Sequence, residues 1–186
     1  VARVKALMDA QLDGVLAETR RVDTGRLGIP VFVSICGPRA RGVMPTRKQM
    51  GKGAHPAQAE ASALMELVER FSFFSLWEDA ERFVECTWSE AEQRFGRELL
   101  PLAEVLRSVD DPLDEAAARR LLDLRLWRFC RALDVAAGTG VYVPLDWFKL
   151  LNEFNGSSAG NTHEESILQG GCELVERHVS AVADRE

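Results

Sequence analysis

The sequence predicts a mixed α+β protein in which long helices alternate with short strands. Several segments carry apolar residues at helical spacing, one run alternates apolar and other residues as a strand does, and the pentapeptide ELVER occurs twice, at residues 66–70 and 173–177. With 186 residues, of which 46% are hydrophobic and 28% charged, the chain is long enough to bury one sizeable core. We therefore expect a globular domain.

The first half of the chain is predicted to contain a helix, a strand, a long loop and a second helix. Residues 3–20 have apolar side chains at helical spacing, and residues 27–36 alternate in the manner of a strand. Residues 37–53 are rich in basic residues, glycine and proline, which favours a loop. Pro56 suits the first turn of a helix, and we expect that helix to continue to about residue 79.

The second half is predicted to contain shorter elements and one more long helix. Residues 124–133 and 141–147 are rich in β-branched and aromatic residues and should pair as a hairpin. A glycine-, serine- and asparagine-rich loop at 155–161 leads into a final helix that begins at Thr162 or His163. The other expected elements are a strand at 83–88, a short helix capped by Ser89, and helices at 99–107 and 113–122.

The two ELVER copies belong to a longer duplication. Sliding the chain by the distance between them aligns Gly53 with Gly160, Gln58 with Glu165, Ala59 with Ser166, and Ser62 with Gln169. Each copy thus begins in a glycine-containing loop and continues into a helix. Two glutamates three residues apart lie on the same face of a helix, so each copy presents a pair of carboxylates. Duplicated units of this kind often build one site between them.

Helical periodicity separates a core stripe from a polar stripe in both helices. The predicted core stripes are Leu64, Leu67, Val68 and Phe71 in the first helix, and Leu168, Cys172, Val175, Val179 and Val182 in the second. The polar stripes are Ser62, Glu66 and Glu69 in the first helix, and Glu165, Gln169, Glu173 and Glu176 in the second. In the first helix Met65, Phe73, Leu76 and Trp77 flank the polar stripe, which predicts that it is buried.

These glutamates have two interpretations. A solvated face in which they pair with arginines one turn away would explain either copy alone. Two copies with apolar flanks favour a shared site instead, because clustered buried carboxylates need a compensating cation. Oxygen-only ligation suits Mg²⁺, Mn²⁺ or Ca²⁺. A di-iron site is disfavoured, since neither copy contains the Glu-x-x-His motif of helical di-iron proteins.

Charge and cysteine usage exclude several other classes. The net charge of −6 argues against nucleic acid or an anionic membrane as the main partner. The basic residues of the 37–53 loop could be a solvated loop, a polyanion groove or a contact to nucleotide phosphate. The four cysteines Cys36, Cys86, Cys130 and Cys172 show no CxxC spacing and predict neither a zinc site nor a redox pair. No signal peptide or long apolar run is visible, which favours the cytoplasm.

The stretches GKGAHPAQAEASALMELVERFS and NGSSAGNTHEESILQGGCELVERHV, together with the preceding LGIPV, resemble the YcaO family. The resemblance implies ATP- and Mg²⁺-dependent enzymes that phosphorylate a peptide backbone amide while azoline, amidine or thioamide groups form in ribosomal peptides. Other members are linked to methylthiolation of a ribosomal protein. The implied partners are therefore a peptide or ribosomal protein substrate and a partner protein, and a homodimer is a candidate assembly. A non-catalytic accessory protein that acts through partner binding is the alternative.

The resemblance also assigns roles to individual residues. It implies nucleotide contacts from Ser62, Glu66, Asn161 and Arg177, and metal ligation by Glu69, Glu165, Glu173 and Glu176. Arg70, Gln169 and Lys52 are further candidates. Because family domains are longer, we expect residues 1–186 to be the N-terminal and central part of a single YcaO-like domain and to be inactive alone.

Overall fold

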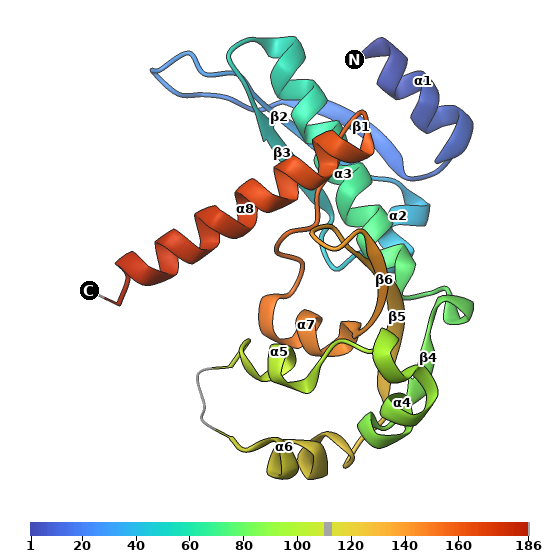
Figure 1. The fold of residues 1–186 in the computed structure, drawn as a ribbon. Coiled ribbons are helices and arrows are strands. Elements are labelled where there is room, and N and C mark those ends of the chain that lie inside the picture. The colour runs from blue at the N-terminus through green and yellow to red at the C-terminus, as the bar shows by residue number, and fades with distance from the viewer. Residues whose placement is uncertain (110–112, 186) are drawn as a thin grey trace. The chain divides into compact units, whose positions relative to one another are not determined.

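The computed structural model describes residues 1–109 and 113–185, which form two compact units (Figure 1). Unit 1 consists of Val1–Glu78 and Phe154–Glu186, and unit 2 consists of Asp79–Glu153. Each unit combines helices with a three-stranded antiparallel sheet. The mixed α+β class predicted from the sequence is therefore confirmed.

The sheet of unit 1 contains β1 (Leu16–Arg21), β2 (Val31–Cys36) and β3 (Lys48–Lys52) in that order. The long helix α3 (Pro56–Leu76) lies across it (Figure 1). Helix and sheet approach closely, because a Cβ atom on Gly51 would lie 2.1 Å from the backbone nitrogen of Ala63. The Ser34 hydroxyl, buried beneath the helix, donates to the Ala63 carbonyl at 2.8 Å.

The core of unit 1 forms where α3 meets the sheet, α1 (Ala2–Gln11) and α2 (Pro38–Val43). Its buried members are Met8, Val15, Cys36, Ala40, Met44, Leu64, Leu67 and Phe71. Leu64, Leu67 and Phe71 belong to the stripe predicted for this helix, and Val68 packs against the same cluster. The core face of α3 is therefore as predicted.

Two predictions for the first half of the chain are wrong. The helix expected over residues 3–20 ends at Gln11, and residues 16–21 form β1 instead. Gly14 adopts a φ of 74°, a turn conformation that leaves the helix, and the following segment pairs with β2. The 37–53 segment is also more ordered than a loop, since it contains α2 and β3. Strand pairing with β2, which is distant in the sequence, overrides the local pattern at β1 and β3.

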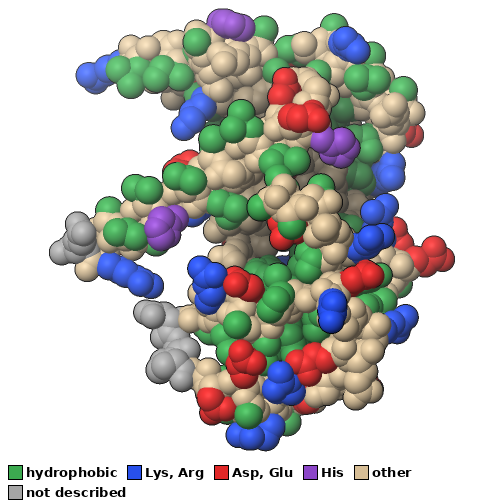
Figure 2. Space-filling model, in the orientation of Figure 1, with side chains coloured by type: hydrophobic (Ala, Val, Ile, Leu, Met, Phe, Trp, Pro, Cys, Tyr) green, Lys and Arg blue, Asp and Glu red, His purple; other side chains and the backbone are tan. Residues whose placement is uncertain are grey.

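The last helix, α8 (His163–Ala183), begins where predicted, but its predicted core stripe is wrong. Leu168, Val175, Val179 and Val182 are 46–68% exposed, and Cys172 is exposed as well. Figure 2 shows apolar side chains along this helix on the molecular surface. Gly170 is the one buried residue among those described in α8. The apolar periodicity is present, but no described element covers it.

Unit 2 contains the predicted hairpin. Strands β5 (Trp127–Asp134) and β6 (Thr139–Pro144) pair antiparallel, and the short strand β4 (Val84–Cys86) pairs with the other edge of β5. The helices around this sheet are α4 (Trp88–Phe95), α5 (Leu102–Leu106), α6 (Glu115–Leu122) and α7 (Leu145–Asn152), with 3₁₀ turns at Ala80–Arg82 and Gly96–Glu98. Trp88, Phe129 and Val105 lie at the centre of the separate core of this unit.

Three details of unit 2 differ from the predictions. Thr87, rather than Ser89, caps α4 in a capping box with Glu90. The Ser89 amide and hydroxyl donate to the Asp123 carboxylate. The strand expected to run to residue 147 ends at Pro144, where α7 begins. Across the described residues, no helix combines the length and apolarity that a membrane crossing requires.

Candidate functional site

The duplicated loop–helix unit is visible in the structure. Both α3 and α8 have 21 residues, and both start with the same arrangement of backbone and side chain. The Gln58 carboxamide accepts from the Ala54 amide at 2.8 Å, and the Glu165 carboxylate accepts from the Asn161 amide at 2.8 Å. These four residues align pairwise in the duplication. The shared geometry shows that the two motif copies fold locally in the same way.

The aligned glycines are required by this geometry. A Cβ on Gly53 would lie 2.8 Å from the Ala59 nitrogen, and one on Gly160 would lie 2.5 Å from the Ser166 nitrogen. Real Cβ atoms essentially never approach so closely. The glycine ahead of each helix is thus explained by a tight turn onto the helix start.

Carboxylates from the two ELVER copies line one cavity. It has a volume of about 270 Å³ and is lined by residues of α3, of α8 and of the loop between Phe154 and Thr162. Its polar lining residues are Ser62, Glu66, Glu69, Arg70, Ser157, Gln169 and Glu173. Seven polar side chains, three of them carboxylates, therefore meet in one small space. This is the convergence that a shared site requires.

The environment of the cavity raises the pKa values of the two α3 carboxylates, Glu66 and Glu69. Burial raises the pKa of Glu69 to about 7, Arg70 opposes the shift, and the charges of Glu173 and Glu66 add to it. Burial also raises the pKa of Glu66, again against the effect of Arg70. The cavity therefore holds more negative charge than its one arginine offsets. A bound cation would relieve that excess.

The loop that precedes α8 orients Glu173. The Gly156 amide donates to the Glu173 carboxylate at 3.2 Å, and Gly156 adopts a φ of 83°. A Cβ on Gly170 would lie 2.5 Å from the Gly156 carbonyl oxygen, so the loop lies directly on the helix. Neither Gly156 nor Gly170 was predicted from the sequence to belong to the site. The Gly-Gly pair ahead of the second ELVER was the available signal.

The same loop uses its backbone amides to hold its own conformation. Its amides at Gly156, Ser157 and Asn161 already donate to Glu173, to the Phe154 carbonyl and to Glu165, respectively. The loop as it stands is therefore held mainly by internal hydrogen bonds.

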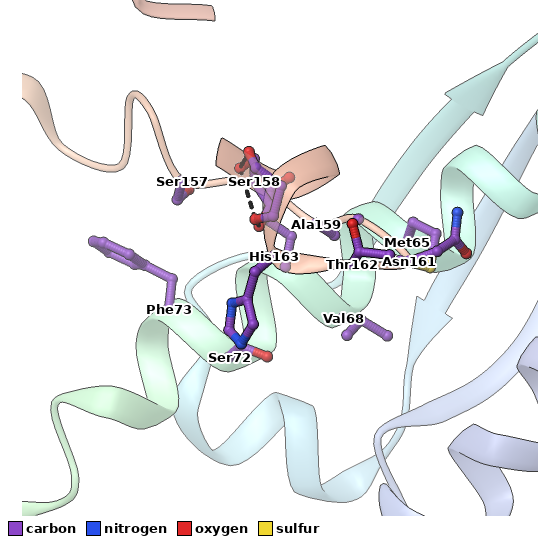
Figure 3. A pocket seen from close by; sticks show the side chains of 13 residues that line it. Met65, Val68, Ser72, Phe73, Ser157, Ser158, Ala159, Asn161, Thr162 and His163 are labelled. Atoms are coloured by element: carbon purple, nitrogen blue, oxygen red, sulfur yellow. Dashed lines mark hydrogen bonds between the residues drawn. The ribbon is translucent and has the colours of Figure 1, made fainter. Parts of the chain in front are cut away.

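Three larger cavities adjoin this loop. One, of about 370 Å³, is lined by Asn161, Glu165 and Gln169 together with Met65 and other apolar groups. A second, of about 580 Å³, lies between α1 and α3 and reaches the loop at Gly160 and Asn161. The third, of about 570 Å³, lies at the start of α8. Figure 3 shows its lining, with His163 extending toward Ser72 on α3. No role was predicted for His163 from the sequence.

The remaining predicted residues lie apart from these cavities. Glu176, Arg177 and Lys52 are exposed, and the described cavities are not lined by them. The exposed Arg177 guanidinium lies 3.5 Å from the carboxylate of Glu173, which is a loose ion pair. Among the residues that the structure describes, no three His, Cys, Asp or Glu side chains are close enough to hold a metal ion as placed. The carboxylate and amide oxygen donors of the cavity are of the kind that Mg²⁺ prefers.

Comparison with known proteins identifies a family model that matches most of this chain. Residues 50–186 match the family model described as "YcaO cyclodehydratase, ATP- and Mg²⁺-binding". The matched region includes both loop–helix units. The family model thus covers every predicted site residue, and the matched domain is an ATP- and Mg²⁺-binding domain.

A curated relative supports the same assignment. The chain is 31% identical over 146 residues to the "Ribosomal protein S12 methylthiotransferase accessory factor YcaO" of Escherichia coli (strain K12). The alignment covers 69% of this chain and 25% of that protein. The chain thus spans about a quarter of the curated relative.

Solved structures show the same fold. The YcaO structure from Methanopyrus kandleri, bound with AMPPCP and Mg²⁺, matches with a TM-score of 0.60 at 20% identity, over 99% of this chain and 44% of that one. A heterocyclase in complex with substrate and cofactor matches with a TM-score of 0.62 at 22% identity, over 94% of this chain and 27% of that one. At these identities the similarity concerns the fold.

Proposed function

Because the chain belongs to the YcaO family, we propose that it contributes the Mg²⁺-ATP site of an enzyme that phosphorylates a peptide backbone amide. The observation that carries this proposal is the cavity in which Glu66, Glu69 and Glu173 meet. An ordinary solvated helix face does not bury carboxylates from two helices against one another. A site for a cation and its phosphate ligand does.

The residues of the cavity divide by position. We assign Glu69 and Glu173 to metal ligation because both line the cavity and lie close enough for the charge of Glu173 to raise the pKa of Glu69. Glu165 and Glu176 are assigned to the same cation set, Glu165 from the neighbouring cavity and Glu176 from the exposed turn that follows Glu173. Bound Mg²⁺ would offset the charge of the triphosphate, so that carboxylates and phosphates can share the site.

Nucleotide contacts are assigned to the groups that surround these carboxylates. Ser62 and Glu66 lie on the α3 side of the cavity, and Asn161 lies at the turn before α8. Arg177 is exposed one turn beyond Glu173, and we assign its guanidinium to phosphate oxygens, which arginine binds well. The role of the chain itself is to bind and orient the nucleotide, since positioning and electrostatics dominate phosphoryl transfer.

The substrate is proposed to be a peptide, with azoline, amidine or thioamide formation as the outcome, or a ribosomal protein. The second candidate function is an accessory role in methylthiolation, and the name of the 31% identical relative favours it. A non-catalytic accessory protein would act through partner binding. It would not need carboxylates buried in a cavity, which favours the enzyme. The proposal also includes a cytoplasmic location for the enzyme. It further includes a partner protein and assembly as a homodimer.

Titration calorimetry tests the proposal. ATP is titrated into the full natural protein with Mg²⁺ present and again with EDTA. We expect binding that requires Mg²⁺ and ATP hydrolysis that depends on an added peptide substrate. Equal ATP binding in EDTA would contradict the metal assignment. Mg²⁺-dependent binding without turnover on any peptide or ribosomal protein would favour the accessory role.

A further inference from the structure

The arginines that end the two ELVER copies have different surroundings. Arg177 of α8 is 57% exposed and loosely paired with Glu173. Arg70 of α3 is 14% exposed and contacts the loop that precedes α8. The geometry points to Arg70 as a positioning residue that clamps this loop onto α3 and thereby sets how Glu173 faces Glu69. This inference rests on the proposed function, in which Glu69 and Glu173 bind Mg²⁺.

Arg70 makes three contacts, two of which reach the loop. Its guanidinium carbon lies 3.8 Å from the centre of the Phe154 ring, and its Nη1 donates to the Ser157 hydroxyl at 3.3 Å. The same nitrogen lies 3.3 Å from the carboxylate of Glu69. One side chain thus joins a cavity carboxylate to both ends of the Phe154–Ser157 turn.

The turn itself is compact and anchored. The Ser157 hydroxyl donates to the Phe154 carbonyl at 2.7 Å, which closes the turn. The Phe154 ring lies 6.4 Å, centre to centre, from the rings of both Phe73 and Phe74 on α3. Arg70 and these two aromatic rings therefore hold Phe154 against one face of the helix.

The turn passes this constraint to the second ELVER copy. Gly156, in the middle of the turn, donates its amide to Glu173 at 3.2 Å. Its carbonyl lies against Gly170, where the helix leaves no room for a Cβ. The connection runs from Glu69 through Arg70 and the turn to Glu173. Displacing the turn would therefore change the separation of the two carboxylates.

The chemistry calls for arginine at this position. A guanidinium can stack on an aromatic ring with its flat face while its edge donates to a hydroxyl and a carboxylate. A lysine retains the positive charge beside Glu69, but it cannot stack a flat face on the ring and donate to the hydroxyl and the carboxylate at the same time. A residue that acts only through its charge would tolerate lysine, so Arg70→Lys separates positioning from charge compensation.

The test compares Arg70→Lys and Phe154→Leu with Arg177→Lys in the full natural protein. Two quantities are measured by calorimetry: the Mg²⁺ concentration at the midpoint of ATP binding, and the ATP affinity at saturating Mg²⁺. We expect Arg70→Lys and Phe154→Leu each to raise the midpoint about tenfold, the range seen when a residue that orients metal ligands is changed. ATP affinity at saturating Mg²⁺ should change less than about twofold, and the double variant should be no worse than either single one. Arg177→Lys should lower that affinity and leave the midpoint unchanged.

Hydrogen exchange of the unliganded protein provides a second readout that does not depend on nucleotide binding. Both clamp variants should speed exchange at the Gly156 amide, whereas Arg177→Lys should not. Unchanged exchange in both clamp variants would overturn the inference. A lower ATP affinity at saturating Mg²⁺ with an unchanged midpoint would also overturn it, because Arg70 would then contact the nucleotide directly. If the wild-type protein showed no Mg²⁺-dependent ATP binding, the proposed function would fail, and the exchange data would still decide whether the clamp exists.

Discussion

Helices α3 and α8 carry the same pentapeptide, have the same length and are capped alike, yet they differ in burial. Ala59, Ala63, Leu64, Leu67 and Phe71 of α3 are buried, whereas the described part of α8 buries Gly170 alone. The matched pair is Leu67, which is fully buried, and Leu174, which is 52% exposed. A duplicated sequence therefore determines the local turn at the start of each helix, but the surrounding chain determines which face of the helix is covered.

The difference extends to the carboxylates. The α3 glutamates lie within a packed unit, and burial raises the pKa values of Glu66 and Glu69. On α8, Glu173 reaches the cavity with the help of the Gly156 amide, while Glu176 remains exposed. Packing of α3 therefore fixes the carboxylates on one side of the cavity. The loop before α8 determines the position of Glu173 on the other side.

The largest expected effect concerns the matched leucines. Leu67→Ala should lower the free energy of unfolding by about 2–5 kcal/mol, because it removes a fully buried side chain from the core of unit 1. Leu174→Ala should cost less than about 1 kcal/mol, because half of that side chain is already exposed. Urea unfolding of both variants checks this. Equal losses of unfolding free energy in the two variants would mean that Leu174 is covered in solution. The difference in burial between α3 and α8 would then not exist.

The next effect concerns pH. The pKa of Glu69 is raised to about 7 in the folded chain from an ordinary value of 4.5, and its side chain is 15% exposed. The folded state then binds a proton that the unfolded state has lost, so metal-free stability should fall as pH rises from about 4.5 to 7. The fall should be at most about 3 kcal/mol. Glu66, whose pKa is also raised, contributes in the same direction.

Glu69→Gln is the variant that isolates this effect. It should match the wild type near pH 4.5, where Glu69 is protonated, and exceed it in stability near pH 8. The matched control is Glu176→Gln, which removes an exposed charge from the other ELVER copy. Urea midpoints across this pH range measure both variants. A pH dependence in Glu69→Gln as steep as in the wild type would show that Glu69 is not the titrating group.

The smallest expected effect concerns the helix caps. The Thr162 hydroxyl accepts from the Glu165 amide at 3.2 Å, and the His55 Nδ1 accepts from the Gln58 amide at 3.3 Å. Thr162→Ala should cost about 1 kcal/mol. His55→Ala should cost less, because the packed face of α3 stabilises that helix independently of its cap. Thermal unfolding of both variants measures these losses. A larger loss for His55→Ala than for Thr162→Ala would mean that tertiary packing stabilises α8 more than α3.

How far the sequence could predict this molecule depends on where the determining contacts lie. The start of α8, the core face of α3 and the meeting of Glu66, Glu69 and Glu173 depend on short-range periodicity and on the duplication, and the sequence predicted them. β1 was mistaken for helix because its pairing with β2 involves residues 11–20 positions away. The exposed stripe of α8 was mistaken for core because apolar periodicity does not reveal whether a partner is present. The role of Gly156 required the loop conformation itself.

A double-mutant cycle on Glu69→Gln and Glu173→Gln tests the central claim most directly, namely that the two ELVER copies hold one Mg²⁺-nucleotide site. The Mg²⁺ dependence of ATP binding to the full natural protein is measured by calorimetry for the wild type, both single variants and the double variant. If the carboxylates share a cation, each single change should weaken Mg²⁺-dependent binding about tenfold or more, and the second change should add much less than the first, with a coupling of about 1 kcal/mol or more. Strictly additive losses would mean that the two carboxylates act at separate sites and would contradict the account.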